Sequence, residues 1–305
     1  MLSVVIPVFR AAASLPELHR RLVDVYGAAP GGLEILFVED CGGDDSWDVI
    51  QTLARTDSRV RGIRLNRNYG QHNALLCGIR EARGAVIVTM DDDLQHPPEE
   101  LPKLLERLEQ GYDVVYGPPN REQHGILRNL ASQITKLALE GAMGAENARQ
   151  VSALRVFRTR LREAFADYRS PTVNIDALLT WATSRFSALP VRHEPRKFGQ
   201  SGYTTTMLLR HAFNMMTGFS IRPLQLASFI GFVFAAFGAV VLAYVLVRWL
   251  IDGSAVPGFA FLASIIAIFS GAQMLALGII GEYLARMHFR TMERPPYVVR
   301  QQVGS

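Results

Sequence analysis

The sequence predicts an α/β protein in which a mostly parallel sheet is flanked by helices and followed by a hairpin of two transmembrane helices. Two observations lead to this prediction. β-branched segments of strand length alternate with amphipathic segments in the N-terminal part, and two long uncharged apolar runs lie near the C-terminus. With two cysteines in 305 residues, disulfide bonds do not build the fold, and an apolar content of 49% excludes a disordered chain.

Strands and helices alternate in order along the N-terminal part. The predicted strands are short and rich in β-branched residues, and they cover 3–8, 34–38, 62–65, 85–90 and 113–116. The predicted helices have apolar residues every three or four positions, and they cover 15–26, 46–55, 71–81 and 98–109. Such alternation gives a sheet covered on both faces, whose ligands bind beyond the carboxyl ends of the strands.

Residues 226–247 and 253–281 contain no charged side chain. A helix of about 20 apolar residues crosses a hydrocarbon core of about 30 Å, so both runs are long enough to span a membrane. We expect spans at about 224–250 and 256–281, joined by a short loop. The alternative is a pair of buried helices in a soluble domain, and long runs without charge disfavour it.

Basic residues flank the two runs on one side. Arg210 and Arg222 precede the first run, the connection holds only Arg248, and the arginines that follow the second run are Arg286, Arg290, Arg294 and Arg300. The positive-inside bias therefore places both termini in the cytoplasm. The predicted organisation is a cytosolic domain at 1–203, an amphipathic juxtamembrane helix at 204–222, two spans within 223–281 and a cytosolic tail at 282–305.

Acidic residues gather where two predicted strands end. Glu39 and Asp40 follow the second strand, and Asp91, Asp92 and Asp93 follow the fourth. Consecutive carboxylates after a buried strand are costly unless a cation neutralises them, and Mg²⁺ combines one or two carboxylates with substrate phosphates. In an extended segment Asp91 and Asp93 share a face while Asp92 points away. The alternative is a solvated acidic turn that caps the helix beginning at residue 98.

Six stretches of the chain carry a family likeness: VVIPVF at 4–9, LNRNYGQHNALLCGI at 65–79, DDDLQHPPEELPKL at 91–104, GYDVVYG at 111–117, RKFGQSGY at 196–203 and GEYLARMHFRTMERPPYVVRQQV at 281–303. Together they resemble the family 2 glycosyltransferases of the GT-A fold, and most closely the polyprenyl-phosphate sugar transferases. The resemblance implies inverting transfer of a sugar from a nucleotide-sugar, expected to be a UDP-sugar, to polyprenyl (undecaprenyl) phosphate. The product would serve lipopolysaccharide or other envelope glycans.

The resemblance also assigns a donor site. The residues expected to bind the nucleotide-sugar are Pro7, Phe9, Glu39, Asp40, Gln71, Asp91 and Asp92. The residues expected to hold the cofactor, Mg²⁺ or Mn²⁺, are Asp91, Asp93 and Gln95, and the metal would stabilise charge that develops on the leaving diphosphate. The expected catalytic residues are Asp93, Arg128 and Arg196. His72 and His96 are interpreted as polar residues of the pocket wall, because imidazole suits zinc better than magnesium.

The acceptor phosphate is expected to meet a group of basic and hydroxyl side chains, namely Arg121, Arg128, Ser132, Arg196 and Lys197. A lipid phosphate is already ionised near neutral pH, so it needs no general base. Ordinary solvated surface charge is the alternative for these residues. Stretches 126–143 and 204–219 have the amphipathic pattern of interfacial helices, which would bring the active site to headgroup depth. A core-facing helix is the alternative, above all for 126–143.

The expected partners are a nucleotide-sugar, a polyprenyl phosphate lipid, the bacterial cytoplasmic membrane and further copies of the chain. Nucleic acid is not expected in spite of an isoelectric point of 9.2, because no aromatic and basic platform is present. A processive polysaccharide synthase is the alternative enzyme. Two spans form no channel, however, and Val245 occupies the glutamine position of the motif that would end at Arg248 and Trp249. A non-catalytic scaffold would not need the carboxylates Asp91 and Asp93.

Overall fold

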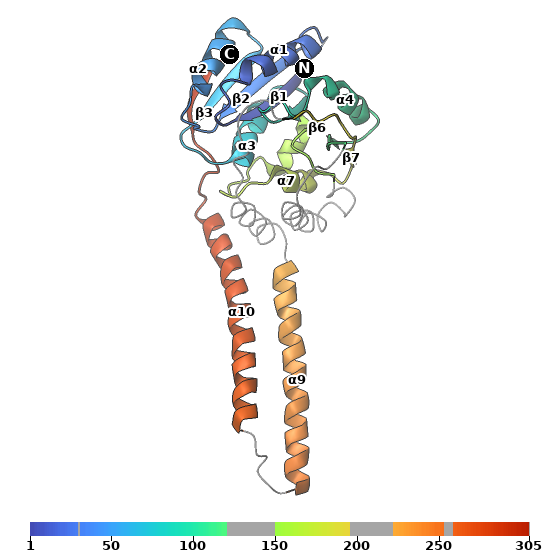
Figure 1. Ribbon diagram of the computed structural model, residues 1–305, viewed down its shortest axis with the longest axis vertical. Helices are drawn as coiled ribbons and strands as arrows, with labels where there is room; N and C mark the ends of the chain where they lie inside the picture. Colours follow the sequence, from blue (N-terminus) through green and yellow to red (C-terminus); the bar gives the residue numbers. More distant parts are fainter. Residues whose placement is uncertain (30, 121–149, 196–221, 253–258, 305) are drawn as a thin grey trace. The chain divides into compact units, whose positions relative to one another are not determined.

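The computed structural model describes residues 1–29, 31–120, 150–195, 222–252 and 259–304 (Figure 1). The chain forms two compact units. One contains Met1–Ala212 together with Glu293–Ser305, and the other contains Phe213–Met292. The predicted juxtamembrane helix at 204–222 and the amphipathic stretch at 126–143 lie outside the described residues, apart from Arg222.

The first unit is built on an eight-stranded sheet with the order β7-β5-β6-β4-β1-β2-β3-β8. Its strands are β1 (Leu2–Val8), β2 (Leu33–Glu39), β3 (Val60–Leu65), β4 (Val86–Thr89), β5 (Val114–Tyr116), β6 (Arg155–Arg158), β7 (Phe186–Ala188) and β8 (Val299–Val303). β1 pairs in parallel with β2 and β4, and β2 pairs in parallel with β3. β6 runs antiparallel to both β4 and β5, and β8 runs antiparallel to β3. The predicted fold class, a mostly parallel sheet flanked by helices, is confirmed.

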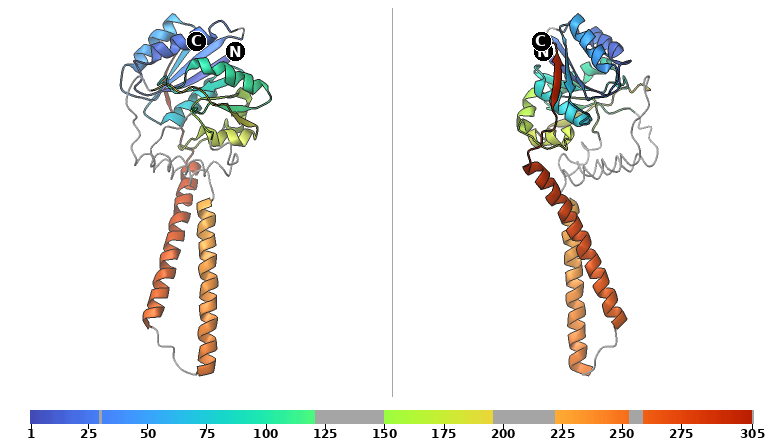
Figure 2. Two further views of the ribbon diagram at one scale, coloured as in Figure 1. Left: turned by 45° about the vertical axis from the view of Figure 1, so that its right-hand side comes forward. Right: turned by 90° about the vertical axis from the view of Figure 1, so that its left-hand side faces the viewer.

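Helices cover the sheet in two groups. The first group packs into one apolar cluster with the sheet, and it consists of α1 (Leu15–Tyr26), α2 (Ser46–Thr56) and α4 (Leu101–Glu109). The short helix η1 (Pro98–Glu100) precedes α4 and contacts α1. The second group consists of α3 (Gln71–Glu81), η2 (Thr159–Phe165) and α7 (Ile175–Ala182), which contact one another while α3 packs on β1 and β2. Figure 2 shows these layers from two further directions.

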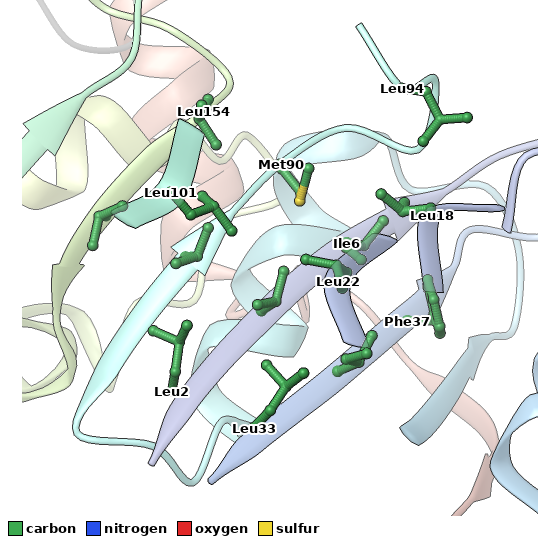
Figure 3. Packing of buried hydrophobic residues seen from close by; sticks show 14 of the residues in the cluster. Leu2, Ile6, Leu18, Leu22, Leu33, Phe37, Met90, Leu94, Leu101 and Leu154 are labelled. Atoms are coloured by element: carbon green, nitrogen blue, oxygen red, sulfur yellow. The ribbon is translucent and has the colours of Figure 1, made fainter. Parts of the chain in front are cut away.

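The alternation of side chains along β1 explains the two layers. Val4, Ile6 and Val8 belong to the cluster with α1 and α4, part of which Figure 3 shows. The intervening Val5 points to the opposite side, because successive side chains of a strand face opposite ways. There α3 approaches so closely that a Cβ on its Gly78 would meet the side chains of Val5 and Val38. Glycine is therefore required for α3 to pack this closely on the sheet.

Among the described residues of the sheet unit, three strands and two helices were not predicted from the sequence: β6, β7, β8, η2 and α7. β8 has the sequence VRQQV, and its first four residues are exposed, so it lacks the apolar alternation that identifies a strand. It forms because β3 offers an unpaired edge, to which Gln302 and Gln301 pair opposite Ile63 and Arg64. The C-terminal tail is therefore part of the sheet.

The second unit consists of α9 (Arg222–Asp252) and α10 (Phe259–Thr291). Both are long and apolar enough to cross a membrane, with candidate spans at Leu224–Val247 and Ile268–Ala285. The two helices contact each other through aromatic rings: the ring of Phe269 lies 5.3 Å from that of Phe234 and 6.5 Å from that of Phe237. α10 continues beyond the predicted end of the second span at residue 281.

Candidate active site

The site lies where the sheet changes direction of winding. β4, β1 and β2 are neighbours. The chain passes from β1 to β2 through α1 on one face of the sheet and reaches β4 through α3 on the other, and ligands of such sheets bind beyond the carboxyl ends of the strands at this point. Three of the predicted groups of site residues follow these strands directly: Phe9 after β1, Glu39 and Asp40 at the end of β2, and the acidic motif 91–95 after β4. Pro7 is buried inside β1, opposite Val38 of β2.

Asp92 joins the end of β4 to the end of β1. Its Oδ2 accepts a hydrogen bond of 3.0 Å from the backbone amide of Phe9, whose ring is exposed. Burial, together with the negative charges of Asp91 and Asp93, raises the pKa of Asp92 to about 7. The three carboxylates therefore concentrate negative charge at the end of β4.

Asp91 and Asp93 have different partners. Gln71, the first residue of α3, donates from Nε2 to Oδ1 of Asp91 at 2.6 Å. Asp93 accepts from the backbone amide of Gln95 at 3.1 Å, which closes a turn. β4 ends at Thr89, residues 92 and 93 lie in a turn, and Leu94 after them has a φ of 61°. The expectation that 91–93 is an extended segment is wrong, because the buried side chain of Leu94 anchors the turn in the apolar cluster.

Asp40 is buried and accepts two backbone hydrogen bonds of 2.7 Å, from the amides of Tyr69 and Gly70 just before α3. Burial raises the pKa of Asp40 to about 6, against the lowering effect of these two amides. The neighbouring Glu39 accepts from the amide of Gly42 at 2.6 Å, and its Oε2 lies 3.0 Å from Nε of Arg64. These carboxylates shape the loops of the predicted nucleoside pocket from within.

Three non-glycine residues just after these strands have positive φ: Arg10 (57°), Cys41 (55°) and Leu94 (61°). Arg10 also donates from Nε to the carbonyl of Gly42 at 3.0 Å, which links the loops after β1 and β2. Strained backbone of this kind is typical of functional sites. The left-handed conformation of Arg10 was not predicted from the sequence, because nothing in its local pattern indicates it.

Residues 193 and 194, about 100 positions further along the chain, contact the acidic motif. The amide of Glu194 donates to the carbonyl of Gln95 at 2.9 Å, and His193 meets the ring of His96 edge-on at 5.1 Å between centroids. Burial, followed by the effect of His193, lowers the pKa of His96 to about 4, so its ring is neutral at neutral pH. His72 accepts from the amide of Ile175 through Nδ1 at 3.2 Å. Sequence spacing carries no signal for the contact with residues 193 and 194.

Five predicted residues lie outside the described part of the chain, namely Arg121, Arg128, Ser132, Arg196 and Lys197. Their roles at the acceptor phosphate, and the catalytic roles of Arg128 and Arg196, stay predictions.

The predicted metal ligands are hard oxygen donors. Within the described residues, no group of three or more His, Cys, Asp and Glu side chains is arranged as a complete metal site. Mg²⁺ and Mn²⁺ do not need one, since a substrate diphosphate supplies further oxygens. Burial is the main cause of the raised pKa of Asp92, and the negative charges of Asp91 and Asp93 add to it. The carboxylates of Asp91 and Asp93, with the side-chain amide oxygen of Gln95, therefore fit a divalent cation that binds together with an anionic ligand.

An acidic motif at the carboxyl end of β4 in such a sheet fits the class of enzymes that bind an anionic ligand together with a divalent cation. Residues 3–168 match Glycosyl transferase family 2. This chain belongs to that family and is a glycosyltransferase with a GT-A domain.

The chain is similar over nearly its whole length to two undecaprenyl-phosphate 4-deoxy-4-formamido-L-arabinose transferases. It is 35% identical to that of Pseudomonas syringae pv. syringae, over 99% of this chain and 91% of the relative. It is 36% identical to that of Pseudomonas aeruginosa, over 99% and 90%. The prediction of a family 2 enzyme most like the polyprenyl-phosphate transferases is confirmed.

Two solved structures share the fold. Glucosyl-3-phosphoglycerate synthase from Mycobacterium tuberculosis, in complex with Mn²⁺, UDP and phosphoglyceric acid, matches with a TM-score of 0.54 and 14% identity, over 72% of this chain and 78% of that one. Mannosyl-3-phosphoglycerate synthase from Rubrobacter xylanophilus matches with a TM-score of 0.52 and 16% identity, over 70% and 72%.

Proposed function

We propose that this enzyme transfers a sugar from a UDP-sugar to undecaprenyl phosphate at the cytoplasmic face of a bacterial membrane, with inversion at the anomeric carbon. The observation that carries the proposal is the similarity to undecaprenyl-phosphate transferases over 99% of the chain, which includes both apolar helices. The product would be a polyprenyl-phosphate-linked sugar for lipopolysaccharide or another envelope glycan. The catalytic domain and both termini would lie in the cytoplasm.

The donor would lie across the carboxyl ends of β1, β2 and β4. Phe9 presents an exposed ring just after the end of β1, which suits contact with a nucleoside. Asp91 and Asp93 with Gln95 would hold Mg²⁺ or Mn²⁺, and a structural neighbour of the same fold was crystallised with Mn²⁺ and UDP. The metal, when bound, supplies positive charge that stabilises the leaving diphosphate.

The acceptor needs no deprotonation, because a lipid phosphate is ionised at neutral pH. The chain would have to hold two anions in line, one on each side of the anomeric carbon, so that displacement inverts it. Positioning and charge compensation would then supply most of the catalysis. We assign the compensation to Arg121, Arg128, Arg196 and Lys197, with Ser132 as a further donor. Glu194, which contacts the acidic motif through its amide, lies two positions before Arg196 in the sequence.

The test is incubation of the purified full-length enzyme with undecaprenyl phosphate, Mg²⁺ and a panel of radiolabelled nucleotide-sugars. We expect one or a few UDP-sugars to give a radiolabelled lipid that is stable to mild alkali and released by mild acid. A parallel reaction without undecaprenyl phosphate is the control. If no donor in the panel yields a lipid-linked sugar, the proposed function is wrong.

A further inference from the structure

Helix α3 begins at the active site and is fixed there at each of its first positions. Gln71 donates to Asp91 of the acidic motif at 2.6 Å. The next residue, His72, accepts from the amide of Ile175, the first residue of α7. The orientation of α3 therefore determines where the carboxylate of Asp91 is held.

The third position of the helix faces neither the motif nor α7. Asn73 is buried, and its Nδ2 donates to the carbonyl of Pro171 at 3.1 Å and to that of Pro296 at 2.6 Å. Pro296 comes from the far end of the chain, after the second membrane helix. Both protons of one amide group are thus used to tie α3 to two other segments.

The segment around Pro296 makes further contacts with the sheet unit. We call residues 295–303 the tail segment. The phenol of Tyr297 lies 3.5 Å from Nη1 of Arg80, further along α3, and the amide of Asn66 donates to the carbonyl of Val298 at 2.9 Å. β8 then pairs with β3. Two consecutive prolines limit the conformations of the chain before these contacts, so the carbonyl of Pro296 is presented in a restricted position.

We propose that the tail segment positions Asp91 through Asn73 and α3, so that the chain after the second membrane helix is a working part of the active site. Asn73 is a positioning residue in this arrangement. The inference deepens the proposed function, because it takes Asp91 as part of the donor site. Loss of the Asn73 amide would remove the hydrogen bonds to both proline carbonyls and would release the first turn of α3.

The experiment compares Asn73→Leu and Pro296→Ala with the wild-type full-length enzyme by hydrogen exchange. Pro296→Ala keeps the accepting carbonyl. It makes the chain that presents this carbonyl less stiff and removes two methylene groups of a buried ring. Glu293→Gln is the matched control, since its ion pair with Arg169 lies just before the tail segment and both side chains are more than half exposed.

We expect backbone amides in residues 71–76 and 91–95 to exchange about tenfold faster in Asn73→Leu and about threefold faster in Pro296→Ala, with no change in Glu293→Gln. In the lipid-transfer assay, both variants should need more Mn²⁺ for half-maximal rate while the KM for undecaprenyl phosphate stays the same. If Asn73→Leu does not fold, Pro296→Ala decides the matter.

Unchanged exchange in residues 91–95 would overturn the inference, even if residues 71–76 exchanged faster, because the tail segment would then stabilise α3 without reaching the motif. This outcome is distinct from failure of the proposed function, in which the wild-type enzyme forms no lipid-linked sugar whatever its exchange pattern.

Discussion

The two ends of the sheet treat buried carboxylates in opposite ways. At the amino end, burial raises the pKa of Glu34, but hydrogen bonds from the amide of Arg83, from Ser3 and from Arg61 outweigh it and leave the pKa below its ordinary value. At the carboxyl end, burial dominates and raises the pKa of Asp40 to about 6 and that of Asp92 to about 7.

The backbone conformation also differs between the two ends of the sheet. At the amino end, the positive φ before β2 belongs to a glycine, Gly32, whereas at the carboxyl end three positive φ values belong to Arg10, Cys41 and Leu94. The amino end thus has a buried carboxylate with a lowered pKa and its positive φ at a glycine. The carboxyl end has buried carboxylates with raised pKa values and positive φ at residues other than glycine. The comparison teaches that the amino end is optimised for stability, and that the carboxyl end keeps negative charge and strain which a ligand can use.

The largest expected effect comes from the carboxyl end of the sheet. Asp93→Asn removes one carboxylate from the predicted metal ligands, and we expect turnover in the lipid-transfer assay to fall about 10³-fold. The melting temperature should change little, because the side-chain carbonyl oxygen of the introduced asparagine can still accept the turn hydrogen bond from the amide of Gln95. Asp24→Asn, at an exposed carboxylate of α1, is the control and should keep full activity. Turnover within tenfold of wild type would place the metal elsewhere.

The next effect comes from the amino end of the sheet. Arg61→Met leaves Glu34 buried without its guanidinium partner, which is 2.7 Å away, and should lower the free energy of unfolding by roughly 3 kcal/mol. Thermal unfolding of the catalytic unit, followed by tryptophan fluorescence, measures this loss. Breaking the exposed pair of Arg20 and Asp24 by Arg20→Met should cost less than about 1 kcal/mol. Equal losses in the two variants would contradict the assignment of Glu34 to a structural role.

The contributions of Asp40 and Glu34 to the free energy of unfolding should change with pH in opposite directions. Asp40 binds its proton more tightly in the folded state, with a pKa of about 6 against 3.8, so the wild-type chain loses stability as pH rises through this window. The stability of Asp40→Asn relative to wild type should therefore rise by up to about 3 kcal/mol between pH 4 and pH 7.

Glu34→Gln gives the opposite comparison. Glu34 stabilises the fold above its unfolded pKa, and this contribution is lost as pH falls through its lowered folded pKa. The loss of stability in Glu34→Gln, relative to the wild-type chain, should thus be largest near neutral pH and should become smaller in acid. Chemical unfolding of the three proteins across this pH range measures both slopes, and slopes of the same sign would remove the distinction between the two ends.

The smallest effect concerns strain alone. Cys41→Gly removes the side-chain clash at a φ of 55° but gives the unfolded chain more freedom, so we expect a net gain below about 1 kcal/mol. Leu94→Gly is the contrasting variant. Its φ is similar, but its buried side chain would be lost, and we expect a loss of about 3 kcal/mol. A melting temperature that falls in Cys41→Gly would show that this conformation is not strained.

Much of the fold could be predicted from local pattern. The helix predicted at 15–26 and that at 71–81 coincide with α1 and α3, and the first four predicted strands correspond to β1–β4 within one or two residues at each end. Periodicity suffices here because each element buries one face or both. β6 has an arginine at each end, β7 has one large apolar residue, and β8 places only Val303 against the apolar cluster, so none of them shows the apolar run of β1, β2 or β4.

The candidate site was predictable in its residue types and less so in its geometry. Strand ends in such a sheet converge, so Phe9, Asp40 and the acidic motif could be brought together from the sequence alone. The turn at Leu94 and the contact of Glu194 with Gln95 could not, because each depends on a partner distant in the chain or on a strained φ.

The sequence by itself determined the order of strands and helices, the apolar hairpin and the place of the acidic motif, since all three are properties of neighbouring residues. Tertiary structure decided which buried carboxylates have a lowered pKa and which have a raised one. It also decided that the chain returns after α10 to pair with β3 and to contact α3 through Asn73. A pKa depends on burial and on partners brought from elsewhere, and an open sheet edge accepts any strand that reaches it.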